Sequence, residues 1–171
     1  ANDVVYHGIG TPPSLIIIKN RDVGTSSGAW GIFTDRVEAE RLQFDTNGDF
    51  NNYPIQSFDA NTFQLPTLNN IAWSFANDYI AYCFASIEGY SKIGIYTGNG
   101  NSTDGTFVYT GFRPAFVITK KCSGTSNWNM IDNHRPNEFN PANNGLLANS
   151  NLSESILGTS HPTDLLSNGF K

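Results

Sequence analysis

An internal repeat constrains the fold of this chain more than any other feature of its sequence. Residues 13–19 (PSLIIIK) resemble residues 114–120 (PAFVITK), and each run is followed by a Gly-Thr-Ser turn and then by a tryptophan, Trp30 or Trp128. Further matches follow in the same order: Leu42 with Leu147, and residues 61–63 (NTF) with residues 168–170 (NGF). The repeating unit spans the distance from residues 13–19 to residues 114–120, which is too long for a solenoid repeat. The sequence therefore predicts two related halves.

Short runs with apolar alternation and β-branched residues indicate strands. The predicted strands are residues 14–19, 29–33, 71–75, 79–87, 91–96, 107–110, 115–120 and 127–131. Residues 35–44 remain open between helix and strand, because Glu38 to Arg41 favour a helix whereas the matching second segment contains Pro136. The chain also has 21 Asn and 16 Gly, which favour turns. We therefore expect an all-β fold, a jelly-roll-like β-sandwich built from two related halves.

The repeat also predicts the domain organisation. Residues 1–96 form the first half, residues 97–171 form the second, and the two are expected to pack together as one domain. The first half continues past Phe63 into the predicted strands at 71–75 and 79–87, whereas the second half ends just after Phe170. The second half is therefore expected to be incomplete at its C-terminus, with the matching strands supplied by another chain or by a longer form of this one.

A series of aromatic and glycine-rich motifs resembles a known family. These motifs are residues 79–85 (YIAYCFA), 88–92 (EGYSK), 96–100 (YTGNG) and 107–117 (FVYTGFRPAFV), with 7–10 (HGIG) and 165–171 (LLSNGFK) at the two ends. Together they resemble an uncharacterised repeat domain of marine bacteriophage tail and fibre structural proteins. The resemblance implies a virion structural role and supplies no catalytic residues. Members of that family usually continue past the Asn-Gly-Phe-Lys motif into a final aromatic strand, so this chain departs from the pattern there.

One segment is a candidate for calcium. Asp45, Asn47 and Asp49 place oxygen-bearing side chains at alternate positions, which can converge on a hard cation. However, the glycine of this segment is Gly48 rather than the sixth loop residue of an EF-hand, and no bidentate Glu follows at the twelfth. An Asx-rich turn is the competing interpretation, and no other cofactor is expected.

The sequence offers no recognisable catalytic residues. It contains no Gly-x-Ser-x-Gly elbow, no His-Glu-x-x-His motif and no glycine-rich phosphate loop. His7, His134 and His161 lack the spacing of metal ligands, and the acidic residues form no evident pair. Trp30, Trp73 and Trp128 are expected to pack in the core, with sugar stacking as the alternative. Cys83 and Cys122 are not expected to form a disulfide.

The net charge and the hydropathy of the chain limit the kinds of binding partner that we expect. The net charge is −5 and only 15% of residues are charged, with no basic patch, so nucleic-acid binding is not expected. The longest apolar run, residues 15–18, is far too short for membrane insertion. We expect a non-enzymatic structural module of a phage tail fibre or surface appendage, located on the virion or outside the cell. Such a module is expected to form homo-oligomers and to contact a host surface glycan. The alternative is a secreted bacterial carbohydrate-binding module.

Overall fold

A computed structural model describes residues 4–22, 30–35, 41–44, 57–64, 77–101, 103–135, 140–156 and 162–171. These residues contain strands and turns but no helix, and all strand pairs are antiparallel. The predicted all-β, sandwich-like fold is therefore confirmed. The chain divides into two compact units: unit 1 comprises residues 1–86 and 122–125, and unit 2 comprises residues 87–121 and 126–171. The predicted boundary after residue 96 and the packing of the halves as one domain stay predictions.

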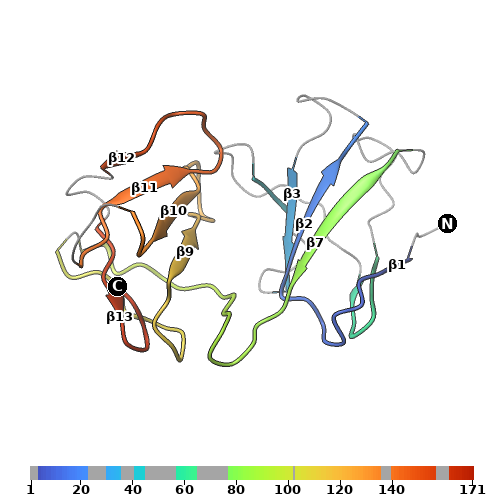
Figure 1. Ribbon diagram of the computed structural model, residues 1–171, viewed down its shortest axis with the longest axis horizontal. Helices are drawn as coiled ribbons and strands as arrows, with labels where there is room; N and C mark the ends of the chain where they lie inside the picture. Colours follow the sequence, from blue (N-terminus) through green and yellow to red (C-terminus); the bar gives the residue numbers. More distant parts are fainter. Residues whose placement is uncertain are drawn as a thin grey trace. The chain divides into compact units, whose positions relative to one another are not determined.

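Unit 1 contains two sheets. The three-stranded sheet has the order β1-β6-β5, with bounds Val4–Tyr6, Thr62–Gln64 and Ser57–Phe58. The four-stranded sheet has the order β4-β3-β2-β7, with bounds Arg41–Gln43, Trp30–Thr34, Leu15–Asn20 and Tyr79–Phe84. Figure 1 shows β2 between β3 and β7. Both neighbours of β2 are therefore strands that run antiparallel to it.

The core of unit 1 joins these two sheets. Alternate residues of β2 are buried, so Ile16 and Ile18 point to one face, where they meet Phe33 of β3 and Phe63 of β6. Val5 and Phe58 of the three-stranded sheet pack against the same cluster. Burial of each such large side chain contributes about 1.5–3 kcal/mol to stability. Unit 1 is thus a small sandwich of a four-stranded and a three-stranded sheet.

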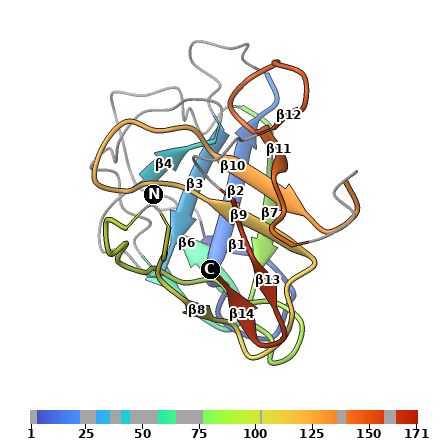
Figure 2. The ribbon, with the colours of Figure 1, turned by 90° about the vertical axis from the view of Figure 1, so that its left-hand side faces the viewer.

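Unit 2 repeats this plan. Its three-stranded sheet has the order β13-β14-β8, with bounds Leu165–Leu166, Gly169–Phe170 and Val108–Tyr109 (Figure 2). Its four-stranded sheet has the order β12-β11-β10-β9, with bounds Ser155–Ile156, Asn144–Leu147, Asn129–Asp132 and Phe116–Thr119. The core of unit 2 again joins one sheet to the other. Its buried residues are Val117, Ile131, Ala142 and Leu165, with Phe170 packed against them.

The predicted repeat is visible in the strand register of the two hairpins. Leu15 of β2 pairs with Thr34, four residues after Trp30. Its counterpart Phe116 of β9 pairs with Asp132, four residues after Trp128. The next strand also keeps its register, because Ile32 pairs with Leu42 and its counterpart Met130 pairs with Leu146. The structural counterpart of Leu42 is therefore Leu146, so the sequence match with Leu147 was wrong by one residue. The apolar pair Leu146-Leu147 hid this shift.

The repeat also covers the three-stranded sheets, where the sequence analysis had found only one motif. Phe63 pairs with Val5 and Phe58, and its counterpart Phe170 pairs with Val108 and Leu165. The strands end alike too: the N–H of His7 donates to Asn61 O at 3.0 Å, and the N–H of Thr110 donates to Asn168 O at 3.0 Å. Residues 4–8 (VVYHG) and 107–111 (FVYTG) thus occupy matching positions in the two units.

Most predicted strands that lie in the described residues are confirmed. The segments at 79–87, 107–110 and 115–120 contain β7, β8 and β9. Those at 14–19, 29–33 and 127–131 overlap β2, β3 and β10, each of which ends one residue later than predicted. Residues 35–44 contain the strand β4 at their C-terminal end, and residues 36–40 of this segment lie outside the described residues, as does the predicted strand at 71–75. The strand predicted at 91–96 is wrong. Within the described residues, Ser91 forms an isolated bridge to Ile87, and residues 92–96 belong to no strand.

The turn between β5 and β6 is organised by one carboxylate. The Asp59 carboxylate accepts a hydrogen bond from the Thr62 hydroxyl at 2.6 Å. It also accepts hydrogen bonds from the backbone N–H groups of Asn61 and Thr62, at 2.7 and 2.6 Å. The hydroxyl, followed by the two N–H groups, lowers the pKa of Asp59. A lowered pKa stabilises the folded state above the unfolded pKa of about 3.9. This stabilisation is lost as the pH falls through the folded-state pKa.

We therefore predict that Asp59→Asn destabilises unit 1 in a pH-dependent way. The loss should be constant above about pH 5 and should shrink below about pH 4, since protonation removes the same charge from the wild type. Urea denaturation of the wild type and of Asp59→Asn, carried out both above about pH 5 and below about pH 4, measures the difference in their free energies of unfolding. Thr62→Val serves as a matched variant, because it removes the hydroxyl donor and should reproduce part of the pH dependence. A difference that does not vary with pH would contradict the assignment.

Candidate functional site

The most unusual surface of the described residues is a loop that exposes large apolar side chains. We call the segment from Ile87 to Tyr109 the apolar loop. Its exposed large side chains are Ile87, Tyr90, Ile95, Tyr96, Phe107 and Tyr109. Tyr90 is the most exposed of them, at 79%. These side chains have the amphipathic or apolar character that binding surfaces use.

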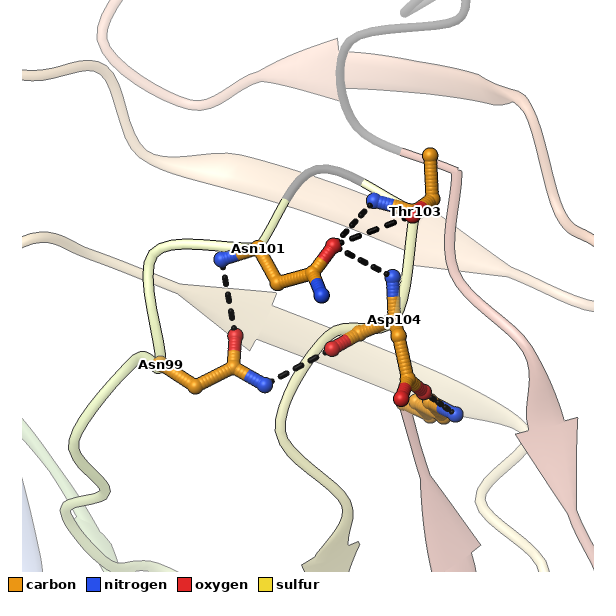
Figure 3. Close-up of polar contacts among 5 residues, drawn as sticks. Asn99, Asn101, Thr103 and Asp104 are labelled. Carbon is orange, nitrogen blue, oxygen red and sulfur yellow. Dashed lines mark hydrogen bonds and ion pairs between the residues drawn. The ribbon is translucent and has the colours of Figure 1, made fainter.

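The apolar loop is held by hydrogen bonds between its own polar groups (Figure 3). The Asn101 Oδ1 accepts from the N–H of Thr103 at 2.9 Å, from its hydroxyl at 3.0 Å and from the N–H of Asp104 at 3.0 Å. Asn99 acts on both sides of this turn: its Oδ1 accepts from Asn101 N–H at 3.0 Å and its amide donates to Asp104 O at 2.7 Å. These Asn side chains form hydrogen bonds with backbone groups of the loop that are not paired with a strand.

Two further contacts hold the apolar loop, one near its start and one near its middle. Gly89 has a φ of 74°, which allows the tight turn that brings Ser91 N–H to Ile87 O at 2.9 Å. Tyr96 packs edge-on against Phe170 of β14, with ring centroids 6.1 Å apart. The loop therefore presents its exposed side chains from a defined conformation, which lowers the entropic cost of binding.

One carboxylate of the apolar loop is held in an ion pair. Asp104 forms an ion pair with Lys171, whose hydrogen bond and charge lower the pKa of the Asp104 carboxyl. The carboxylate is thus ionised and already paired at neutral pH. A general acid or base would need a pKa close to the working pH. The exposed rings and amide groups can make apolar contacts and hydrogen bonds with a partner.

The structure gives a partial account of the residues that the sequence singled out. The calcium candidates Asp45, Asn47 and Asp49 lie outside the described residues. His7 lies in a turn, where its Nε2 is 3.1 Å from Asp59 O and its Nδ1 accepts the N–H of Ile9 at 3.3 Å. Across the described part of the chain, no group of three or more His, Cys, Asp or Glu side chains lies close enough to hold a metal ion.

The tryptophans differ between the two units. Trp128 is 7% exposed, as expected for core packing, so its ring face is closed to a sugar. Trp30 is half-buried and stacks on Tyr82 of β7, with ring centroids 6.4 Å apart. Trp73 lies outside the described residues. Their backbones are nevertheless equivalent, because Trp30 O accepts from Phe44 N–H and Trp128 O accepts from Ala148 N–H.

Within the described residues, no disulfide joins Cys83 to Cys122. Burial raises the pKa of the Cys83 thiol, which keeps it protonated at neutral pH. The described residues contain no helix long and apolar enough to cross a bilayer.

Sequence reasoning had assigned residues 91–96 and 107–110 of the apolar loop to strands. Ile95 was therefore not recognised as a surface residue, and Tyr90, between two predicted strands, was not singled out. The available signal was the presence of aromatic and branched apolar residues in a segment that is also rich in Gly and Asn. Such a segment cannot bury its apolar side chains through strand pairing, so they stay on the surface.

These features define an all-β protein of two related two-sheet units, with an ordered apolar loop in the second. The chain belongs to the family described as Domain of unknown function (DUF7483), whose model matches residues 1–171. Comparisons with curated proteins and with solved structures found no significant match.

Proposed function

We propose that this protein is a non-enzymatic structural module of an extracellular assembly, a phage tail fibre or related virion appendage, in which copies associate through the apolar loop. The single observation that carries the proposal is the exposure of large apolar side chains on a segment held by its own hydrogen bonds. We infer that these side chains form one binding surface, since contiguous exposed apolar patches on soluble proteins mark interaction sites. The motifs shared with phage tail and fibre proteins support the virion as the setting.

Composition and repetition agree with this proposal. Only 15% of the residues are charged, so association does not have to overcome strong charge repulsion. Two related units in one chain also provide the repetition that elongated assemblies use. A catalytic role has no support in the apolar loop, whose Asp104 is already paired with Lys171. Contact with a host glycan is a further part of the proposal and would use the exposed tyrosines rather than Trp128.

The proposal predicts that the wild-type chain self-associates and that Tyr90→Ser with Ile95→Ser weakens this association. Each change removes an exposed apolar side chain, so together they should raise the dissociation constant by at least about 30-fold. Analytical ultracentrifugation over a concentration series measures the effect. Urea denaturation should show unchanged stability, because both side chains are exposed in the free protein.

Leu152→Ser is the matched control, because Leu152 is equally apolar and is 68% exposed but lies outside the apolar loop. It should leave the dissociation constant unchanged. A chain that remains monomeric at every concentration would contradict the proposal, and so would an equal effect of Leu152→Ser. Glycan binding by a strictly monomeric chain, abolished by Tyr90→Ala, would favour the carbohydrate-binding alternative.

A further inference from the structure

The two four-stranded sheets differ at one edge. In unit 1, β2 pairs with β3 on one side and with β7 on the other. In unit 2, β9 is the counterpart of β2 and pairs with β10, and no strand among the described residues pairs with its other edge. We call this the outer edge of β9. Unit 2 therefore lacks, within the described residues, a strand at the position that β7 occupies in unit 1.

The polar groups at this outer edge follow from the register. Asn133 N–H donates to Ala115 O at 3.1 Å, so Ala115 faces β10. Backbone groups alternate in direction along an antiparallel strand, which places the N–H and C=O groups of Phe116 and Ile118 at the outer edge. Their side chains are 54% and 39% exposed. An unpaired edge with apolar side chains is a template for a further strand.

We propose that the outer edge of β9 binds an extended segment of a second polypeptide, which adds antiparallel to the sheet and has the sequence character of β7. In unit 1, Leu15 pairs with Phe84 and Ile17 pairs with Tyr82. The counterparts of Leu15 and Ile17 are Phe116 and Ile118. The incoming strand thus places one aromatic residue opposite Phe116 and another opposite Ile118, and its main chain completes the sheet.

The antiparallel register of β7 on β2 gives the direction of the incoming strand, and a cation beside β9 agrees with it. In unit 1, Arg21 N–H donates to Asp78 O at 2.8 Å, so an acidic residue precedes β7 where β2 ends. In unit 2, the exposed Lys121 directly follows the predicted strand at 115–120, next to the position that corresponds to Arg21. An acidic residue ahead of the incoming strand therefore meets a cation there. This inference rests on strand pairing and on the exposed side chains at β9, and it is independent of the proposed function.

A peptide of residues 77–86 (NDYIAYCFAS) tests the proposal directly. The full chain is held at a concentration at which sedimentation shows a monomer, and the peptide is titrated under reducing conditions with fluorescence detection. Binding should also raise the unfolding temperature, because the peptide binds only the folded state. Absence of binding to a chain that is folded by circular dichroism overturns the proposal.

Two N-methylated peptides distinguish strand addition from unspecific apolar binding. Asp78 O faces β2, so by alternation the N–H of Tyr82 also faces β2, whereas the N–H of Ala81 points away. Methylation of the Tyr82 nitrogen should weaken binding at least about tenfold, since it removes a hydrogen bond and blocks close approach. Methylation of the Ala81 nitrogen should have less than about a twofold effect. Equal effects of the two methyl groups overturn the proposal.

A pair of protein variants locates the site on β9. Ile118→Lys places a charge on the outer edge and should abolish peptide binding, because charged side chains block strand addition. Ile95→Lys adds the same charge in the apolar loop and should leave peptide binding unchanged. Urea denaturation confirms that both variants fold. Retained binding to Ile118→Lys, or an equal loss in both variants, places the peptide elsewhere and overturns the proposal.

Discussion

Gly169→Ala is expected to separate β14 from β8 and to destabilise unit 2 by about 3 kcal/mol or more. A methyl group at this position would overlap the carbonyl oxygen of Val108 and would lie 2.8 Å from the ring of Phe107. The first contact is with backbone of the neighbouring strand, so rotation of a side chain cannot relieve it. The hydrogen bonds between β8 and β14 must break instead, and Phe170 then no longer packs against the core of unit 2.

Hydrogen exchange and urea denaturation together test this result. The amide groups of β8 and β14 should lose protection, and the free energy of unfolding should fall. Gly94→Ala is the matched control, because a methyl group there meets no atom within 4 Å. The double variant Gly169→Ala with Phe107→Val should not recover stability, since the contact with Val108 O remains. Wild-type stability of Gly169→Ala would show that the β8–β14 pairing is wrong.

Phe63→Ala is expected to destabilise unit 1 by about 3–5 kcal/mol. Phe63 is 1% exposed and contributes the ring from the three-stranded sheet to a cluster with Ile16, Ile18 and Phe33. Its removal leaves a cavity between the two sheets, and strands on both sides are paired and cannot close it. The loss should therefore exceed that of an exposed aromatic residue several-fold.

The repeat supplies a matched comparison for this change. Phe170 occupies the corresponding position in unit 2 but is only partly buried, so Phe170→Ala should cost less than Phe63→Ala. Calorimetry of both variants measures the difference. Equal losses would contradict the burial pattern, and a small loss for Phe63→Ala would show that the two sheets of unit 1 do not share one core.

The sequence predicted the long strands because they carry enough residues to show alternation. β2 and β9 each contain a branched apolar run and were found with nearly correct bounds. The strands of two residues, β5, β8, β12, β13 and β14, are too short for a periodic signal, so only β8 was predicted, as part of a longer run. Their existence depends on pairing with distant segments, such as Val108 with Phe170, which no local pattern reports.

The candidate site was harder to predict than the fold. The sequence directed attention to Asp45, Asn47 and Asp49, which lie outside the described residues, so the calcium hypothesis stays a prediction. It also assigned residues 91–96 to a strand, because Ile93 and Ile95 alternate with polar or small residues. Alternation shows that a segment suits a sheet, but a strand also needs a neighbour that accepts its hydrogen bonds.

Because the two units share the same strand register, their core residues can be compared position by position. The comparison shows which substitutions the same backbone arrangement accepts. Ile16 and Val117 are counterparts, as are Phe33 and Ile131, and Phe58 and Leu165. In each pair the residue of unit 2 is smaller, and Ala142 joins the core of that unit. Hairpin exchange between the units therefore offers a way to separate what the backbone requires from what side-chain volume requires. An exchanged hairpin would pair with its new neighbours in the same strand register, and only the volume of the core side chains would change.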